Sequence, residues 1–179
     1  MLAKSANPLH RMVYASLFGA LTAAGSLIVI PMQPVPITLQ TLFTCLSGIL
    51  LGARAGGLSQ IIYVLLGIIG LPVFAGGKAG AGVLFGPSGG YLIGFVVGAY
   101  VMGKIVEIRR EPGWVWLLMA LLVGNLIIYT LGTWQLMEVT GFSLVKSLMV
   151  GVVPFLFGDL LKIVATAWLG VKISKHFNL

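Results

Sequence analysis

Long apolar segments follow one another along almost the entire chain, separated by short polar or glycine- and proline-containing connections. A bilayer core about 30 Å thick needs a helix of roughly 20 apolar residues to cross it. Six segments come near that length, at residues 12–30, 37–52, 55–74, 89–106, 114–137 and 147–171. The pattern therefore predicts an all-α bundle of six transmembrane helices that forms a single domain over residues 1–179.

One connection between these segments is unusually long. Residues 75–88 form a glycine-rich and weakly apolar loop that runs into the fourth segment at Gly89. Long loops in compact proteins are usually functional or disordered, and Val83, Leu84 and Phe85 favour being covered by other groups. Free N–H groups at a helix start attract anions, and glycines let a ligand approach the backbone closely. We expect a carboxylate to bind at this loop, with Lys78 as a possible partner; the alternative is an outer loop without a ligand.

The composition supports a membrane location. Of the 179 residues, 59% are hydrophobic and 8% are charged, whereas a soluble domain usually has about 25% charged residues. The net charge of +7 would suggest nucleic-acid binding in a soluble protein, but in a membrane protein basic loops on the cytoplasmic side explain it better. The single cysteine, Cys45, excludes an intramolecular disulfide. We predict an integral membrane protein that does not bind nucleic acid.

The distribution of Lys and Arg predicts the orientation. With the N-terminus in the cytoplasm, the loops on the inside carry eight basic residues, which are Lys4, Arg11, Arg54, Lys104, Arg109, Arg110, Lys172 and Lys175. Only Lys78 and Lys146 then lie outside, and Lys162 lies within the membrane. This bias predicts that both termini are cytoplasmic and that the loop at residues 75–88 faces outward, together with the proline-containing connection PMQPVPI.

Motifs for catalysis and for metal or cofactor binding are not convincing. The stretch GPSGG matches the nucleophile-elbow pattern around Ser88, but the two histidines, His10 and His176, lie near the chain ends. The stretch around GGKA lacks the first glycine and the hydroxyl residue of a phosphate-binding loop. No cluster of His, Cys or carboxylate residues has metal-ligand spacing. We therefore expect neither an enzyme nor a bound cofactor.

Small residues recur with a spacing of four in the first segment. Ala15 and Gly19 form one such pair, and Ala20 and Ala24 form a second. Small side chains let two helix backbones approach closely within lipid. The pattern fits either packing inside the bundle or a docking face for a separate membrane subunit, and the residues alone do not separate these two interpretations.

Asp159 and Lys162 interrupt the last apolar segment. Their spacing of three places both on one helix face, and counting from Ser147 puts Asp159 about 18 Å along the helix. Each charge within the membrane costs at least about 2.5 kcal/mol, so mutual pairing is expected. The pair is either a structural ion pair or a binding site for a polar group that both donates and accepts hydrogen bonds. Other candidates for such a site are the polar Gln40 and Asn125, and the aromatic Phe74, Tyr91 and Trp134.

Three stretches together resemble the BioY family. They are VPITLQTL, LPVFAGGKAGAGVLFGPSGGYLIGF and GDLLK, and the likeness covers nearly the whole chain in order. These proteins are the biotin-specific substrate-binding (S) components of energy-coupling factor transporters. The resemblance implies a six-helix bundle that binds biotin with high affinity from the outside of a prokaryotic cell membrane. It also implies two kinds of partner, a transmembrane coupling (T) subunit and two cytoplasmic ATPases.

The resemblance also implies roles for particular residues. Asp159 and Lys162 match the family's binding-site pair in the last helix, and residues 75–88 match the loop that closes the pocket. Lys78 and Ser88 depart from the residues expected in that loop. Biotin has a ureido head, an apolar middle and a carboxylate. Asp159 would accept from the ureido N–H groups and Lys162 would donate to its carbonyl, which leaves the carboxylate near the loop.

Other functional classes remain as alternatives. A stand-alone secondary transporter of a small vitamin-like solute would use Asp159 and Lys162 as a proton relay. A scaffold subunit would give no reason for charges inside the membrane. A membrane enzyme would need the nucleophile, base or metal ligands that the motifs lack.

Overall fold

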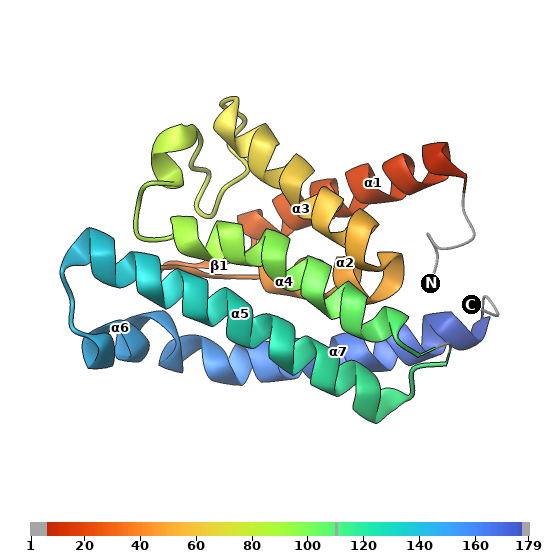
Figure 1. Ribbon diagram of the computed structural model, residues 1–179. Helices are drawn as coiled ribbons and strands as arrows, with labels where there is room; N and C mark the ends of the chain where they lie inside the picture. Colours follow the sequence, from red (N-terminus) through yellow and green to blue (C-terminus); the bar gives the residue numbers. More distant parts are fainter. Residues whose placement is uncertain (1–6, 110, 177–179) are drawn as a thin grey trace.

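The computed structural model describes residues 7–109 and 111–176, without the side chains of residues 174–176. Within the described residues the chain forms seven α-helices, a short two-stranded sheet and one turn of 3-10 helix (Figure 1). The helices are α1 (Pro8–Leu27), α2 (Gln40–Leu51), α3 (Ala53–Ile68), α4 (Gly89–Glu107), α5 (Trp114–Thr140), α6 (Leu144–Gly151) and α7 (Val153–His176). The fold is thus all-α apart from the small sheet, in agreement with the predicted class.

The helices run back and forth between two ends of an elongated bundle. The start of α1 and the end of α7 lie at one end (Figure 1). The connection between α3 and α4 and the short helix α6 lie at the opposite end, here called the loop end (Figure 1). Within the part of the chain that the structure describes, three helices are long and apolar enough to cross a membrane, over Gly89–Glu107, Trp114–Thr140 and Val153–Ile173, while α2 and α3 are shorter apolar helices.

The first connection differs from the prediction. The first and second segments were predicted as helices over 12–30 and 37–52, but α1 ends at Leu27 and α2 begins at Gln40. The residues between them form strands β1 (Val29–Ile30) and β2 (Ile37–Thr38), which pair antiparallel. The intervening stretch has prolines at 31, 34 and 36, and proline lacks the N–H that a continuing helix needs. A proline-containing hairpin therefore replaces the expected helix ends.

The third segment is also shorter than predicted. The expected helix over 55–74 is observed as α3, which begins at Ala53 and ends at Ile68. Gly70 has a φ of +106°, a conformation that only glycine adopts easily, and it turns the chain out of the helical direction. Phe74 consequently lies in the loop, where its N–H donates to the carbonyl of Lys78 over 3.0 Å. The loop then forms the 3-10 turn η1 (Ala81–Val83) before α4.

The last predicted helix, over 147–171, is broken in two. Helix α6 ends at Gly151 and α7 begins at Val153. Pro154 explains the break, because it has no N–H to bond to the carbonyl of residue 150 and its ring would clash with that carbonyl in a continuous helix. Asp159 therefore lies six residues, or about 9 Å, from the start of α7, rather than about 18 Å along an unbroken helix. This places it nearer the loop end than the sequence suggested.

Close packing of α4 on α5 organises the centre of the bundle. Gly90, Gly94 and Gly98 of α4 recur at a spacing of four and face α5. A Cβ atom added at Gly94 would lie only 2.8 Å from the Cα of Ile128. Such small residues allow backbone contact, which drives helix association in membranes. The two helices therefore form a tight central pair that holds residues of both in fixed positions.

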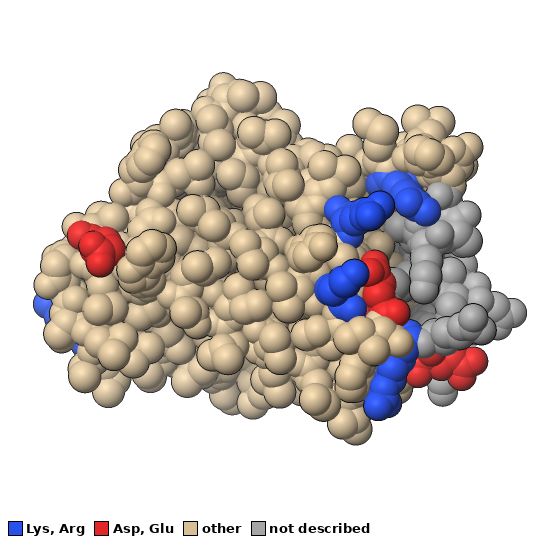
Figure 2. Space-filling view, viewed as in Figure 1, with Lys and Arg blue, Asp and Glu red and all other residues tan. Residues whose placement is uncertain are grey.

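Lys and Arg side chains gather at the end of the bundle opposite the loop end (Figure 2). That end carries the start of α3, with Arg54, and the end of α4, with Lys104. The Glu107 side chain accepts from the backbone N–H of Ala53 over 2.9 Å, so it caps the start of α3. Lys78 and Lys146 lie on elements at the loop end. The two ends of the bundle thus differ in basic charge.

Candidate functional site

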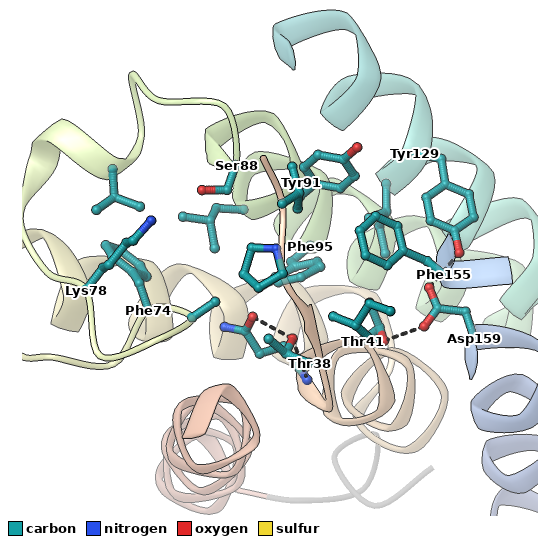
Figure 3. Close-up of a pocket in the computed structure, with 18 of the residues that line it drawn as sticks. Thr38, Thr41, Phe74, Lys78, Ser88, Tyr91, Phe95, Tyr129, Phe155 and Asp159 are labelled. Atoms are coloured by element: carbon teal, nitrogen blue, oxygen red, sulfur yellow. Dashed lines mark hydrogen bonds between the residues drawn. The ribbon is translucent and has the colours of Figure 1, made fainter. Parts of the chain in front are cut away.

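A narrow pocket of about 60 Å³ lies between the loop end and the middle of the bundle. Its walls come from the hairpin, α2, the loop at residues 75–88, α4, α5 and α7. Figure 3 shows Asp159 and Tyr129 at one end of the pocket and Lys78 at the other. Six of the predicted site residues line it, namely Gln40, Phe74, Lys78, Tyr91, Asp159 and Lys162. The fold therefore brings together residues separated by up to 122 positions in the sequence.

Asp159 is held by three neighbours at the deep end of the pocket. One carboxylate oxygen, Oδ1, accepts from the Thr41 hydroxyl at 3.0 Å and from Lys162 Nζ at 2.7 Å. The other oxygen, Oδ2, accepts from the Tyr129 hydroxyl at 2.6 Å (Figure 3). Asp159 is 5% exposed, and burying a carboxylate is costly unless it has such hydrogen-bonding and charged partners. The network fixes the orientation of the carboxylate relative to the pocket.

Lys162 is paired in the same network. Its ammonium donates to the carbonyl of Thr38 at 2.7 Å, to the Thr41 hydroxyl at 2.9 Å and to Asp159 at 2.7 Å. Strand β2 ends at Thr38, so the carbonyl that accepts from Lys162 belongs to the β1–β2 hairpin. Both charged side chains line the pocket. The site can therefore present a hydrogen-bond acceptor and a donor side by side to a neutral polar group.

Aromatic side chains form the middle of the pocket. Phe74, Tyr91, Phe95 and Phe155 all line it and are all buried. The rings of Tyr91 and Phe155 meet edge to face, with centroids 6.3 Å apart and an interplanar angle of 75°. The Tyr91 hydroxyl donates to the carbonyl of Gly151 at 2.8 Å, so it is not free to turn into the pocket. These walls suit an apolar ligand segment.

Gln40 occupies a buried position at the start of α2. Its side-chain oxygen accepts from the Thr38 hydroxyl at 2.8 Å, and its amide nitrogen donates to the Tyr63 hydroxyl. Both hydrogen-bonding ends of the amide thus have protein partners. Gln40 lines the pocket, but its hydrogen bonds fix the hairpin against α2 and α3.

The loop at residues 75–88 is packed onto the bundle rather than extended from it. The Phe74 ring fills the space beside Gly67 of α3, where any Cβ atom would overlap it. Near the end of the loop, the side-chain amide of Gln135 of α5 donates to the carbonyls of Leu84 at 2.6 Å and Gly86 at 2.9 Å. These contacts place Lys78 at the mouth of the pocket.

Two predicted residues do not join the pocket wall. Asn125 is buried behind it, where its amide nitrogen donates to the carbonyl of Leu121 at 3.0 Å and contacts the Cys45 sulfur at 3.4 Å. It lines a separate crevice between α5 and α7 instead of the pocket. Trp134 is 62% exposed on the outer face of α5, so it forms no pocket wall. Where both faces of a helix are apolar, its sequence does not show which residues face lipid and which face the pocket.

The four small residues of the first segment, for which internal packing and a docking face were both open, divide into two pairs. Ala15 and Gly19 are buried, and a Cβ atom at Gly19 would lie 2.9 Å from the Ser59 carbonyl oxygen of α3. This pair packs inside the bundle, which is the first of the two interpretations that the spacing allowed, and it is not open to another subunit. Ala20 and Ala24 are exposed on the opposite side of α1. Only this second pair is available to another subunit.

Sequence reasoning missed three residues that complete the polar network. Thr38 and Thr41 lie within the stretch VPITLQTL, but only Gln40 was selected from it. Tyr129 lies one turn beyond Asn125 on α5, and it reaches Asp159 where Asn125 does not. The hydroxyl of Thr41, three residues after that of Thr38, was a signal from which both residues could have been selected. Nothing in the α5 sequence marked Tyr129 as the residue opposite Asp159.

Comparisons with known proteins give the same family along the whole chain. The sequence model of the BioY family matches residues 2–179. The Biotin transporter BioY of Thermotoga maritima is 42% identical over 93% of this chain and 97% of its own length. The Biotin transporter BioY of Rhizobium etli is 36% identical over 94% of this chain and 95% of its own.

A solved structure shares the fold. It is described as a crystal structure at 2.1 Å of the S-component for biotin from an ECF-type ABC transporter. It superposes with a TM-score of 0.85 at 30% sequence identity, covering 93% of this chain and 92% of the other. The names of these proteins describe transport and not catalysis. With apolar helices of spanning length and a family match over residues 2–179, the chain belongs to the BioY family of membrane transport proteins.

Proposed function

We propose that this protein binds biotin in the pocket and mediates biotin uptake. The Asp159–Lys162 pair, oriented by Thr41 and Tyr129, is the observation that carries the proposal. A ureido group has N–H donors and a carbonyl acceptor on one small ring, and this pair offers the complementary acceptor and donor. The names of the relatives support biotin as the substrate.

The substrate takes one direction in the pocket under this proposal. The ureido head lies at Asp159 and Lys162, and the ring and chain lie between the aromatic side chains. The carboxylate then lies at the mouth, near Lys78 and Ser88 at the approach to α4. The reverse direction would set the carboxylate beside Asp159, and two like charges in a buried site disfavour each other.

Binding requires the pocket to widen. Ligand pockets usually have about 300–1,000 Å³, and the present volume is about 60 Å³. The loop at residues 75–88 is the element best suited to move, because Gly76, Gly77 and Gly80 have positive φ and glycine can change its backbone conformation at little cost. We propose that this loop opens to admit biotin and then closes over it.

We propose that the chain acts as the S component of an ATP-driven energy-coupling factor transporter. It would cross the plasma membrane of a prokaryote six times as one domain, with α6 and α7 forming the last crossing and both termini in the cytoplasm. The basic end of the bundle would then face the cytoplasm, as the positive-inside rule expects. Biotin would bind from the outside, at the loop end. A transmembrane T subunit would dock on Ala20 and Ala24, and two ATPases would supply the energy.

Two measurements test this function. Calorimetry on the purified chain should detect biotin binding, and its absence would refute the substrate assignment. Uptake of labelled biotin into proteoliposomes, with and without the T subunit and ATPases, tests the energy source. Uptake that follows a proton gradient without these partners would favour the stand-alone transporter instead.

A further inference from the structure

A second cavity opens directly beyond the mouth of the pocket. It has a volume of about 790 Å³ and is much wider than the pocket itself. Pro36, Ala75 and Lys78 belong to the walls of both cavities, so the two meet at these residues. The remaining wall comes from the proline-containing hairpin loop, Pro87 and the region around α6. We call this cavity the vestibule.

The charged residues of the vestibule wall are both basic. They are Lys78, which it shares with the pocket, and Lys146, which belongs to α6. No Asp or Glu is among its described lining residues, and Glu138, which lies near the end of α5, does not contribute to the wall. The ammonium of Lys146 lies 3.7 Å from the centroid of the Phe142 ring, another wall residue, which holds it at this position.

Lys146 lies at a position in its helix where a positive charge lowers the stability of the helix. Its backbone N–H donates to the Ser143 hydroxyl that caps α6, so Lys146 lies in the first turn of that helix. A cation is unfavourable there, because the helix start already carries partial positive charge. The positive charge of Lys146, which lines the vestibule, therefore adds to the partial positive charge of the helix start beside it.

We propose that the vestibule is a capture site for the carboxylate of the incoming substrate, with Lys146 as its outer cation. This inference rests on the proposed function and adds a step before the pocket. A carboxylate-bearing ligand is first attracted by Lys146 and Lys78 together. As the ureido head moves to the deep end, the carboxylate stays with Lys78, which borders both cavities. Lys146 thus acts on the rate of association and Lys78 also acts on retention.

Electrostatic attraction of a ligand into a vestibule makes the association rate depend on salt concentration. Charges that steer a ligand raise the association rate at low salt, and the effect declines as salt screens the field. The Debye length is about 30 Å at 0.01 M salt and about 3 Å at 1 M. Removing one of two cations should slow association roughly two- to five-fold at low salt. Dissociation should not change, because Lys146 does not line the pocket.

Rapid-filtration kinetics with tritiated biotin on the purified chain test the proposal. Lys146→Gln should slow association about two- to five-fold at 0.01 M salt and leave it unchanged near 1 M. Lys146→Arg keeps the charge and should behave like the wild type. Lys104→Gln removes the same charge from the opposite end and is the matched control, which should also behave like the wild type. The uncharged methyl ester of biotin should associate at the same rate with Lys146→Gln and wild-type protein.

The results separate this inference from the proposed function. Equal association rates for Lys146→Gln and wild-type protein at low salt would overturn the capture site, while normal equilibrium binding of biotin would leave the proposed function in place. An equal loss of rate for the methyl ester, or for Lys104→Gln, would also overturn it, since the effect would then not come from a local attraction of carboxylate. Absence of biotin binding in the wild type would remove both the proposed function and this inference.

Discussion

Replacing Thr41 by valine should weaken biotin binding while leaving the fold intact. Valine has nearly the shape of threonine, and the change replaces the hydroxyl by a methyl group. That hydroxyl donates to Asp159 at 3.0 Å and accepts from Lys162 at 2.9 Å. Without it, the two charged side chains keep their direct contact of 2.7 Å but lose the group that sets their orientation. The ligand would then have to order both side chains on binding.

The magnitude follows from that ordering. Each side chain immobilised on binding costs about 0.5–1.5 kcal/mol. For Asp159 and Lys162 together this gives about 1–3 kcal/mol, which raises the dissociation constant roughly five- to 150-fold. Calorimetry on the detergent-purified variant measures this change in the dissociation constant. Thr130→Val is the matched control, because Thr130 is exposed on α5 and its hydroxyl donates to the Leu126 carbonyl of the same helix.

Two results would refute this reasoning. A dissociation constant of Thr41→Val within two-fold of the wild type would show that the hydroxyl does not organise the pair. An equal loss of affinity in Thr130→Val would show that the effect is not local. Thermal unfolding of each variant accompanies the calorimetry, so that a weakened fold is not mistaken for a weakened site.

Three further predictions concern topology, docking and packing. In a background without the native cysteine, a cysteine at Lys146 should react with an impermeant thiol reagent from outside the cell and one at Arg109 should not; the reverse pattern contradicts the orientation. Ala20→Leu should impair uptake by the complete transporter but spare biotin binding, whereas Ala15→Leu, at a position that is 0% exposed, should lower the yield of folded protein. Gly94→Val would place a Cβ atom 2.8 Å from the facing backbone of α5, and its unfolding midpoint should fall by about 2–8 °C; an unchanged midpoint would mean that the helices are not tightly packed there.

The helical class and most helix positions could be predicted, because lipid requires long apolar helices. The predicted segments at 89–106 and 114–137 correspond to α4 (Gly89–Glu107) and α5 (Trp114–Thr140). The errors lie where a proline or glycine interrupts an apolar run. Pro154 breaks the last helix and Gly70 turns the chain after α3, yet both lie in stretches that are as hydrophobic as their neighbours. Hydrophobicity alone therefore overestimates the helix length at such sites.

The polar core of the site could be predicted for a different reason. A charge within an apolar helix is costly, so Asp159 and Lys162 were conspicuous. Thr41 and Tyr129 carry no such cost, and their part in the network depends on how α2 and α5 are rotated toward α7. Ala15 and Ala20 show the same limit, because one is buried and the other exposed although the sequence pattern around them is alike. Helix rotation is set by packing across the bundle, which single-chain patterns do not encode.

The affinity of two pair variants tests the central claim most directly. Asp159→Asn removes the charge that pairs with Lys162, and Lys162→Met removes the donor to Asp159, Thr41 and the Thr38 carbonyl. If the pair holds the ureido head, calorimetry on monodisperse protein should show binding weakened by about 2–5 kcal/mol in each, or roughly thirty- to several-thousand-fold. Affinities close to the wild type in both variants would show that the pair is structural and would contradict the account.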